Sequence, residues 1–476
     1  MLVLFIPLYL LATLAIGFWA SSRIKTSTDF TLAGKSLSKS FVGVTLFATW
    51  FGSSQIMGIP GDFVNEGFTA FVSLILSGAV CLFLVARFYA RRLYRMNIVT
   101  VGDFFRIRFN RKLDMTVSVL MVMAYPHWIA AQFVALGYLF NGVLGIPIDY
   151  GILLGGVIVI VYTYIGGMWA VSYTDMLQSI MIVLGLIVLL IGIIGETDGI
   201  VPLFTEQPKE FFNLVPRGDL SSWSEYLALF TAFSIGAIPA QEIYQRVFSA
   251  KTERAAVYGL YLGGILLIVV PLIPMIIALA GAQLNPELMD VDGGQGIVPA
   301  LVTIYSSTPV QVLFYGAMIS AILSTSSGAM LAPATVIGEN LIKPYIPGLS
   351  DKRLLLFTRL SVVLVAAASC YFAFDDADIV NLVAASLSLI LVCIFAPFTF
   401  GLFWKPSSVF GAWTAIVSGG VGWFICFLMD TEIDPILYGT PLSCAGMIAG
   451  SLLRPDKSPS QVFEQMDMGS MDGEHP

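Results

Sequence analysis

Charged side chains are scarce in this sequence of 476 residues, where Asp, Glu, Lys and Arg together make up 12%. Soluble domains carry about 25% charged residues, so the side chains that would solvate a globular surface are largely missing. Hydrophobic residues account for 57% of the chain. This composition excludes a soluble enzyme, a nucleic-acid-binding protein and a disordered scaffold. It indicates an all-α membrane protein with many spans.

Histidine and cysteine are also scarce. The two histidines, His127 and His475, are too few for a histidine-based metal site. The five cysteines all lie in apolar runs without the spacing of metal ligands, which predicts that they are small packing residues. No nucleophile, metal or phosphate motif supports an enzymatic function, so we predict that the protein is not an enzyme.

Long apolar stretches occur from one end of the sequence to the other. About 20 apolar residues cross a bilayer as a helix, and the sequence predicts about thirteen such helices. Their approximate positions are 2–21, 41–61, 69–90, 114–142, 148–165, 172–195, 223–247, 254–281, 308–341, 354–374, 378–402, 406–428 and 436–453. The first stretch lacks a basic start and a cleavage site of small residues, so we interpret it as a span and not as a signal peptide.

Basic residues are distributed unequally between the two sets of loops. Of the 24 Lys and Arg residues, only Lys209 and Arg217 fall on one side of the predicted membrane. Cytoplasmic loops carry the excess of basic residues, so this distribution predicts an amino terminus outside the cell and a carboxyl terminus in the cytoplasm. The polar segment 455–476 ends in acidic residues, and we expect it to be a disordered cytoplasmic tail.

Two of the predicted spans contain helix-breaking residues at their centres. Residues 52–55 read Gly-Ser-Ser-Gln and are followed by Gly-Ile-Pro-Gly at 58–61, while residues 234–241 read Ser-Ile-Gly-Ala-Ile-Pro-Ala-Gln. Interrupted helices persist in a bilayer only where they line a cavity or bind a ligand. The two spans are five helices apart and run in opposite directions, which indicates two inverted repeats and a transporter with its site near mid-membrane.

This reasoning divides the chain into a transporter core and flanking segments. The predicted units are 1–40 (first transmembrane helix and cytoplasmic loop), 41–195 (first inverted repeat, helices two to six), 196–222 (extracellular loop), 223–402 (second inverted repeat, helices seven to eleven), 403–454 (last two helices) and 455–476 (cytoplasmic tail).

Three segments carry a family resemblance. They are residues 166–178 (GGMWAVSYTDMLQ), 238–246 (IPAQEIYQR) and 319–327 (ISAILSTSS). In this order they resemble the conserved blocks of the sodium:solute symporter family, and the resemblance runs from the first helix to the last. It implies a LeuT-type fold of five plus five inverted helices in the plasma membrane. It also implies sodium-driven symport of a small organic solute, with no nucleic acid and no obligate protein partner.

A sodium site is expected where the first interrupted helix meets the third conserved block. Ala321, Ser324 and Thr325 are spaced i, i+3 and i+4, so they share one face of a helix. A sodium ion needs several oxygen ligands, and Ala48 and Phe51 precede the break, where unwinding frees carbonyl oxygens. By resemblance these five positions match the family's conserved sodium site. The alternative is that the hydroxyls bond back to their own helix.

Asp175 is the candidate for a second sodium site, together with Ser324 and Ser327. Some family members place an additional ion between this aspartate and hydroxyls of the 308–341 span. The alternative is that Asp175 caps the amino terminus of its helix, where an acidic residue is favourable.

The substrate cavity is expected beside both breaks. Its candidate residues are Trp50, Ser53, Ser54, Gln55, Tyr125, Trp128, Gln132, Gln241 and Glu242. By resemblance, Gln55 falls where sugar-transporting relatives contact their substrate, and Trp50 replaces the aspartate of proline-transporting relatives. Trp50 and Trp128 match tryptophans of the choline-transporting branch, but a further tryptophan of that branch is Ala240 here. The two tryptophans are otherwise explained as apolar wall.

The solute stays open at this point, between a quaternary amine, an amino acid, a sugar and a carboxylate. The main alternative function keeps the fold and changes the coupling. It is a proton-coupled or exchange transporter in which His127, Asp175 or Glu242 carries protons. A channel would show no interrupted inverted pair, and a membrane sensor would need an output domain.

Overall fold

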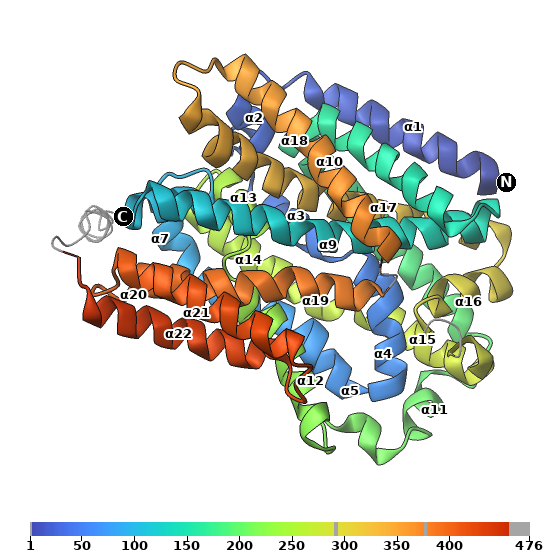
Figure 1. Ribbon diagram of the computed structural model, residues 1–476. Coiled ribbons are helices and arrows are strands. Elements are labelled where there is room, and N and C mark those ends of the chain that lie inside the picture. The colour runs from blue at the N-terminus through green and yellow to red at the C-terminus, as the bar shows by residue number, and fades with distance from the viewer. Residues whose placement is uncertain (1, 290–293, 376–377, 457–476) are drawn as a thin grey trace, which may run out of the picture.

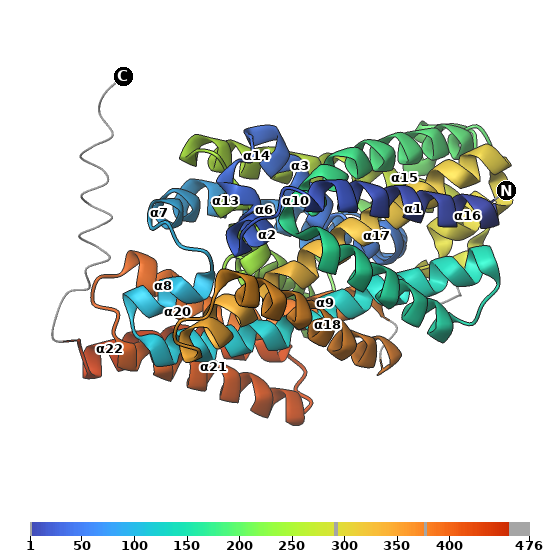
Figure 2. The ribbon, with the colours of Figure 1, turned by 90° about the horizontal axis from the view of Figure 1, so that it is seen from above.

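The computed structural model describes residues 2–289, 294–375 and 378–456. The described chain is helical, and its one β-type contact is an isolated bridge between Leu37 and Ala250. Figures 1 and 2 show the long helices lying alongside one another in a bundle. Helix α1 (Leu2–Ser21) begins at one end of this bundle and α22 (Pro435–Leu453) ends at the other. The predicted tail lies outside the described residues from position 457 onward.

The helices of the first predicted repeat and the segment before it are as follows. They are α2 (Ser27–Leu32), η1 (Ala33–Lys35), α3 (Lys39–Trp50), η2 (Ser54–Gly58), α4 (Ile59–Glu66), α5 (Phe68–Ala70), η3 (Phe71–Leu76), α6 (Ser77–Leu84), η4 (Val85–Tyr89), α7 (Ala90–Arg95), α8 (Val101–Arg108), α9 (Arg111–Leu144) and α10 (Ile148–Ile194).

The remaining helices follow after a loop that contains α11 (Ile200–Thr205) and η5 (Lys209–Phe212). They are α12 (Leu220–Thr231), η6 (Ala232–Gly236), α13 (Gln241–Ser249), α14 (Glu253–Val269), α15 (Leu272–Leu284), η7 (Pro286–Met289), α16 (Ile297–Tyr305), α17 (Thr308–Val336), η9 (Ile337–Ile342), η10 (Lys343–Tyr345), α18 (Asp351–Asp375), α19 (Ile379–Ile390), η11 (Leu391–Phe395), α20 (Ala396–Phe403) and α21 (Val409–Leu428).

Ten helical segments among the described residues are long and apolar enough to cross a membrane. The bent pair formed by α3 and the segment Ser54–Glu66 raises this number to eleven. Two of the predicted spans, 148–165 and 172–195, lie in the single element α10. Gly167 interrupts its helical backbone with φ 51° and ψ −160°, so two helices meet there. This positive φ favours glycine, and an added Cβ would lie 2.4 Å from the Phe30 ring.

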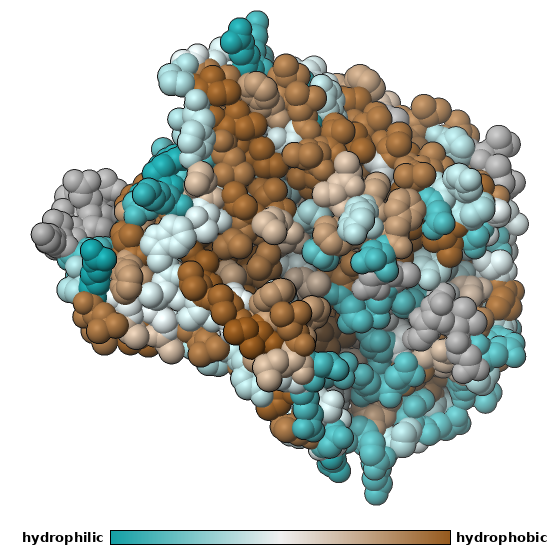
Figure 3. All heavy atoms as spheres, viewed as in Figure 1, coloured by the Kyte–Doolittle hydropathy of each residue, from teal (hydrophilic) through white to brown (hydrophobic). Residues whose placement is uncertain are grey.

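The outer surface of the bundle is suited to contact lipid. Figure 3 shows hydrophobic residues over the middle of one face and hydrophilic residues gathered toward its edges, chiefly around α5 and α11. Large apolar side chains on the outer helices point outward, among them Val417, Val421 and Phe424 on α21. An exposed apolar surface of this extent is characteristic of a membrane protein.

Glycines bring the last two helices into close contact. A Cβ added to Gly450 would lie 2.0 Å from Thr414 Oγ1, and one added to Gly411 would lie 2.0 Å from Ser451 Oγ. Small residues at helix interfaces let backbones approach in a membrane, where no hydrophobic force joins the helices. The Thr414 hydroxyl then donates to the Gly446 carbonyl at 2.7 Å. Helices α21 and α22 therefore pack as a tight pair beside the core.

Helix α17 occupies the centre of the bundle. Every residue from Phe314 to Val336 is buried, and α17 contacts α3, α9, α10 and α18. The segment still contains several serines and threonines. A buried hydroxyl at membrane depth needs a hydrogen-bond partner, so their partners locate the functional site.

At the end of the bundle where the basic loops gather, Arg108 joins α8 to the segment after α20. Its Nε donates to the Gly401 carbonyl at 2.9 Å and its Nη2 donates to the Ser407 carbonyl at 2.8 Å. Burial lowers the pKa of Arg108 to about 10, so the guanidinium remains charged at neutral pH. Its charged donors therefore satisfy carbonyls that the adjacent helix end leaves free.

Candidate functional site

The first predicted interruption is present in the structure. Helix α3 ends at Trp50, Phe51 is non-helical with φ −89° and ψ 78°, and the chain continues as Ser54–Glu66 at a bend of 64°. The amide nitrogens that the break leaves free donate to two side chains. Gly52 N donates to Gln55 Oε1 at 3.0 Å, and Ser53 N donates to Gln132 Oε1 at 2.9 Å.

The second half of that motif behaves differently from its prediction. The Gly-Ile-Pro-Gly sequence at 58–61 lies in η2 and the first turn of α4, where the backbone is helical. Pro60 occupies the beginning of α4, where its missing N–H is tolerated. Ser53 is already helical, with φ −56° and ψ −46°, so the interruption is confined to residues 51–52.

The second predicted interruption is also present. Residue Gly236 ends η6, a turn follows, and α13 begins at Gln241 after an extended Ala240. The turn contains Pro239, which cannot donate a backbone hydrogen bond. The first turn of α13 therefore starts in the interior of the bundle and carries Glu242.

The hydroxyls of Ser324 and Thr325 meet the end of α3. Thr325 Oγ1 lies 3.1 Å from the Ala48 carbonyl oxygen and Ser324 Oγ lies 3.0 Å from it. Both side chains are fully buried, as is Ala321 one turn earlier. We call Ser324 and Thr325 the hydroxyl ledge of α17. Phe51 lies at the break itself, at the carboxyl end of α3.

The neighbouring serines show that this contact is specific. Ser326 Oγ donates to the Ile322 carbonyl at 2.5 Å, and Ser327 Oγ donates to the Ser324 carbonyl at 3.0 Å. Ser326 and Ser327 thus donate to carbonyls of their own helix, whereas the hydroxyl ledge reaches across to another helix. Ser327 was predicted to contribute to a second sodium site, but its hydroxyl is engaged within its own helix.

Asp175 lies beside the hydroxyl ledge. It is fully buried, and its Oδ1 lies 2.6 Å from Ser324 Oγ. Thr325 can donate its proton to the Ala48 carbonyl, which leaves the single proton of Ser324 for Asp175 Oδ1. Asp175 Oδ2 is buried with no hydrogen-bond partner. Asp175 lies inside α10, well after Gly167, so it does not cap a helix.

A small cavity lies between the two breaks, with a volume of about 30 Å³. Its walls are formed by Trp50, Ser54, Gln55, Leu74, Ile75, Gly78, Trp128, Phe233, Glu242, Leu267, Val383 and Leu387. Five of the nine predicted substrate residues are in this set. The volume is enough for water and too small for most organic solutes, so the walls must separate when a solute enters. We call this cavity the central pocket.

Glu242 is the polar centre of the central pocket. Its Oε1 accepts a hydrogen bond from Trp50 Nε1 at 3.2 Å, and its Oε2 accepts one from the Tyr125 hydroxyl. The side chain is 1% exposed. Tyr125 does not line the pocket, but it fixes the position of the carboxylate that does.

The other predicted substrate residues lie behind the walls. Gln132 supports the break through Ser53 N, and neither Gln132 nor Ser53 lines the central pocket. Gln241 binds the segment before α8, because its Oε1 accepts from Val101 N at 2.8 Å and its Nε2 donates to the Val99 carbonyl at 3.3 Å. Gln241 therefore connects the second break to the end of the bundle that carries the basic loops.

His127 does not line the central pocket. Its ring packs on Phe372 of α18 with centroids 3.9 Å apart. A proton carrier at the substrate site would have to contact that cavity, so this position does not support a role for His127 there.

Arg246 is a site residue that the sequence interpretation missed. It was counted with the basic residues of the loops, but its side chain is fully buried. Its Nη2 donates to Thr49 Oγ1 at 2.7 Å and its Nη1 donates to the Glu242 carbonyl at 3.3 Å. The position in the block 238–246, one turn after Glu242, was the available signal. The apolar pocket residues gave no signal, because they resemble the rest of the apolar runs.

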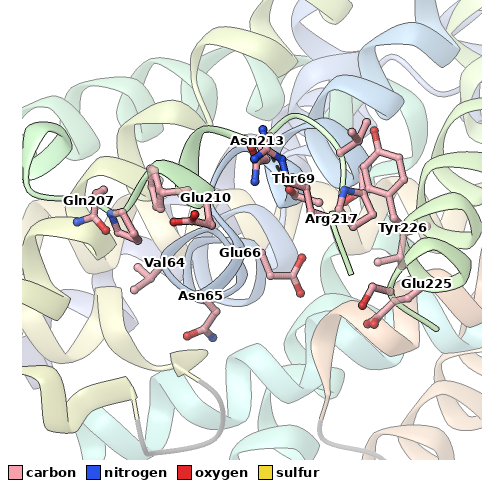
Figure 4. A pocket seen from close by; sticks show the side chains of 17 residues that line it. Val64, Asn65, Glu66, Thr69, Gln207, Glu210, Asn213, Arg217, Glu225 and Tyr226 are labelled. Carbon is pink, nitrogen blue, oxygen red and sulfur yellow. Dashed lines mark hydrogen bonds between the residues drawn. The ribbon is translucent and has the colours of Figure 1, made fainter. Parts of the chain in front are cut away.

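A larger basin opens near the end of α4, with a volume of about 420 Å³. Figure 4 shows Glu66, Glu210, Glu225, Arg217 and Tyr226 around it. These residues come from α4, the loop after α11 and the start of α12. Three carboxylates and one guanidinium give this outer basin a negative potential that attracts cations.

The opposite end of the bundle is closed by a buried polar cluster around Asn340. Its Nδ2 donates to Asp114 Oδ1 at 2.9 Å and to Asp103 Oδ1 at 3.4 Å, while its Oδ1 accepts from the Thr100 hydroxyl at 2.6 Å. Arg111 donates to the Asn340 carbonyl at 2.5 Å. We call these residues the Asn340 cluster. It joins η9 to the starts of α8 and α9.

Comparison with known proteins places this arrangement among transporters. The model of the sodium:solute symporter family matches residues 30–419. The chain is 24% identical to the human high-affinity choline transporter over 93% of this chain and 78% of that one. It is 26% identical to a sodium/glucose cotransporter of Vibrio parahaemolyticus, over 86% and 82% of the two chains. It is 25% identical to the sodium/pantothenate symporter of Escherichia coli, over 93% and 94%.

Solved structures share the fold. A sodium-coupled sialic acid symporter in a substrate-bound outward-open state superposes with a TM-score of 0.83 at 20% identity, covering 96% of this chain and 98% of that one. A nucleobase-cation-symport-1 family transporter in a closed conformation superposes with a TM-score of 0.61 at 14% identity, covering 92% and 98%. At these identities the likeness shows the fold alone.

Proposed function

The chain belongs to the sodium:solute symporter family, and we propose from this premise that sodium bound at the hydroxyl ledge drives uptake of a small organic solute through the central pocket. The protein is a multi-pass membrane protein of the plasma membrane and a sodium-coupled symporter. The proposal concerns which residues bind the ion and the solute.

The sodium proposal rests on the oxygen atoms that lie close together at the hydroxyl ledge. Two hydroxyls converge on the Ala48 carbonyl, and Asp175 adds a carboxylate with one oxygen that has no partner. A buried carboxylate oxygen without a donor, next to a carbonyl and two hydroxyls, is stabilised by a cation, and hard cations prefer oxygen ligands. Ala48, Phe51, Ala321, Ser324 and Thr325 are the proposed ligands. The Asp175 carboxylate with Ser324 is the proposed location of a second ion.

The proposed topology follows the charge distribution. It has thirteen spans when α1 is counted and α10 is divided at Gly167, with the amino terminus outside and the carboxyl terminus in the cytoplasm. Residues 41–195 and 223–402 are the two inverted repeats, and each contains its interrupted helix. This orientation places the outer basin on the extracellular side and the Asn340 cluster on the cytoplasmic side.

The proposed cycle uses the ion to connect two helices that belong to different repeats. Sodium bound between α3 and α17 favours the state that is open to the outside, and the solute then enters from the outer basin and closes the path behind it. Separation of the Asn340 cluster opens the inner path. Loss of sodium from the hydroxyl ledge weakens the solute site, and both leave on the cytoplasmic side.

The driving force is adequate for concentrative uptake. One sodium ion that crosses a potential of 100 mV gains ~2.3 kcal/mol. A tenfold sodium gradient adds ~1.4 kcal/mol. The total of ~3.7 kcal/mol supports accumulation of a neutral solute by roughly 500-fold.

Uptake into proteoliposomes tests the coupling. We expect labelled solutes from a panel of amines, amino acids, sugars and carboxylates to accumulate only under an imposed sodium gradient. Vesicles with a pH gradient and no sodium are the control. Accumulation that follows the pH gradient and ignores sodium would establish the alternative function, in which Asp175 or Glu242 carries a proton.

A further inference from the structure

Glu242 is a buried carboxylate that faces the space where a solute must pass. It lies in the first turn of α13, directly after the second break, and it lines the central pocket with Trp50 and Trp128. An ionisable residue at membrane depth is costly and has a functional role as a rule. The coupling function proposed above does not use Glu242.

The hydrogen bonds of this carboxylate come from neutral groups. Trp50 Nε1 and the Tyr125 hydroxyl each donate to one of its oxygens. Among the residues that the structure describes, no ion pair involves Glu242. Arg246 is one turn further along α13, but the donors of its two Nη groups go to the Glu242 carbonyl and to Thr49. The carboxylate thus has its orientation fixed and lacks a cation in direct contact.

The other walls of the central pocket select against a solute carboxylate. Besides Glu242, the polar side chains that line it are Ser54 and Gln55 together with the indoles of Trp50 and Trp128, and no Lys, Arg or His is among the lining residues described. A negatively charged group entering here would face Glu242, with no cation among the lining residues described. The same negative charge attracts a positive group.

Aromatic and aliphatic side chains form the remaining surface. Trp50 and Trp128 present indole rings, whose faces attract cations, and the rest is mostly apolar. Both Glu242 oxygens already accept a hydrogen bond, so the site does not depend on donors from the ligand. Apolar walls next to an oriented carboxylate suit a positive charge that is surrounded by alkyl groups.

We propose that the central pocket selects an alkylammonium cation and that Glu242 is its counter-ion. This assignment rests on the proposed function, because it names the class of solute that the symporter carries. Gly78 lies next to the Trp50 ring, because a Cβ added to Gly78 would lie 3.4 Å from that ring. Movement of this indole is the expected way for the pocket to widen.

Binding of matched probes to the purified full-length protein tests the proposal. Choline is compared with dimethylbutanol, in which carbon replaces the quaternary nitrogen, and with glycine betaine, which adds a carboxylate. In sodium buffer we expect choline to change tryptophan fluorescence saturably and to raise the melting temperature. The neutral and zwitterionic probes should bind about tenfold more weakly or less. Equal binding of choline and its neutral isostere would overturn the proposal.

Variants test whether the preference for a cation depends on the charge of Glu242. Glu242→Gln keeps the shape of the side chain and removes its charge, and we expect it to raise the dissociation constant of choline about tenfold or more. Glu196→Gln makes the same change on an exposed loop and should leave the constant as it is. Unchanged choline binding in a folded Glu242→Gln protein contradicts the assignment.

A second pair of variants tests the aromatic wall if Glu242→Gln fails to fold. Trp128→Phe keeps an aromatic face and should retain most choline affinity, whereas Trp128→Leu should lose it. Equal affinity in the two variants would contradict the proposal. Sodium alone should stabilise all folded variants through the hydroxyl ledge. Stabilisation by sodium without cation binding rejects only the solute assignment, whereas no response to sodium rejects the proposed function itself.

Discussion

At the scale of single residues, the direction in which each hydroxyl of α17 points separates function from packing. Ser324 and Thr325 reach the Ala48 carbonyl, while Ser326 next to them bonds back within its own helix. These residues are adjacent in sequence and equally buried, so composition does not distinguish them. Because Ser326 has a different partner, a variant of Ser326 is a matched control for a variant of Ser324 or Thr325.

Thr325→Ala should weaken sodium binding. The change removes one oxygen from the hydroxyl ledge, and we expect the sodium concentration for half-maximal uptake to rise about tenfold, which is ~1.4 kcal/mol. Uptake measured over a range of sodium concentrations checks this. Ser326→Ala is the control and should leave the sodium dependence unchanged. The same half-maximal concentration in both variants would count against a sodium ligand at position 325.

Gly52→Ala should damage the same site from the side of the break. An added Cβ would lie 2.6 Å from both Gln132 Oε1 and Thr325 Oγ1. Overpacking of this kind costs about 1–3 kcal/mol, so we expect a lower melting temperature and weaker sodium binding. Gly142→Ala in α9 is the control, because nothing lies within 4 Å of its added Cβ. A Gly52→Ala protein as stable as the control would show that the break is loosely packed.

At the scale of elements, closure of the predicted cytoplasmic end depends on η9 and the starts of α8 and α9. Thr100 and Asp103 form a capping box at the start of α8, and both also contact Asn340. Gln241 connects α13 to the same segment through Val101. The polar groups that cap the start of α8 therefore also bind segment 99–103 to its neighbours. We expect this segment to move as one unit.

Asn340→Ala should loosen this closure. The buried carboxylates of Asp103 and Asp114 lose a donor, and we expect amide hydrogen exchange in residues 99–105 to become about tenfold faster or more. Hydrogen–deuterium exchange with mass spectrometry measures it. Asn381→Ala, at an exposed position in the first turn of α19, is the control. Equal exchange rates in the two variants would show that the Asn340 cluster does not hold the inner path closed.

At the scale of the whole molecule, the basic loops lie on the predicted cytoplasmic side and the outer basin carries carboxylates. Lys343 in η10 and Lys352 and Arg353 in the first turn of α18 are at one end, whereas Glu66 and Glu225 are at the other. We expect this asymmetry to set the orientation in the membrane, because translocation of Lys and Arg is disfavoured. It also concentrates cations at the outer entrance.

Cysteine labelling in intact cells tests this orientation. A membrane-impermeant maleimide should label Glu432→Cys directly and should label Ser350→Cys only after the cells are made permeable. Both positions are exposed, while the five native cysteines are buried or half-buried. Labelling of Ser350→Cys in intact cells would reverse the proposed orientation.

Much of the fold follows from local properties that can be recognised along the sequence. Apolar stretches predicted the helical membrane architecture, and Gly-Ser and Gly-Pro combinations predicted both interruptions. Spacing on one helix face predicted that Ser324 and Thr325 would act together. The helical conformation of 58–61 shows the limit, because a backbone that can break does not always do so.

The sequence by itself determined that this chain crosses a membrane many times and that two of its helices are interrupted, because hydropathy and backbone flexibility are properties of short segments. Only the tertiary structure decided which partners the buried charged and polar side chains contact. Arg246 is buried rather than exposed in a loop, Gln241 accepts a hydrogen bond from Val101 N, and Glu242 accepts hydrogen bonds from Trp50 and Tyr125. Those contacts join residues more than a hundred positions apart, and which faces of two helices meet depends on how all of them pack.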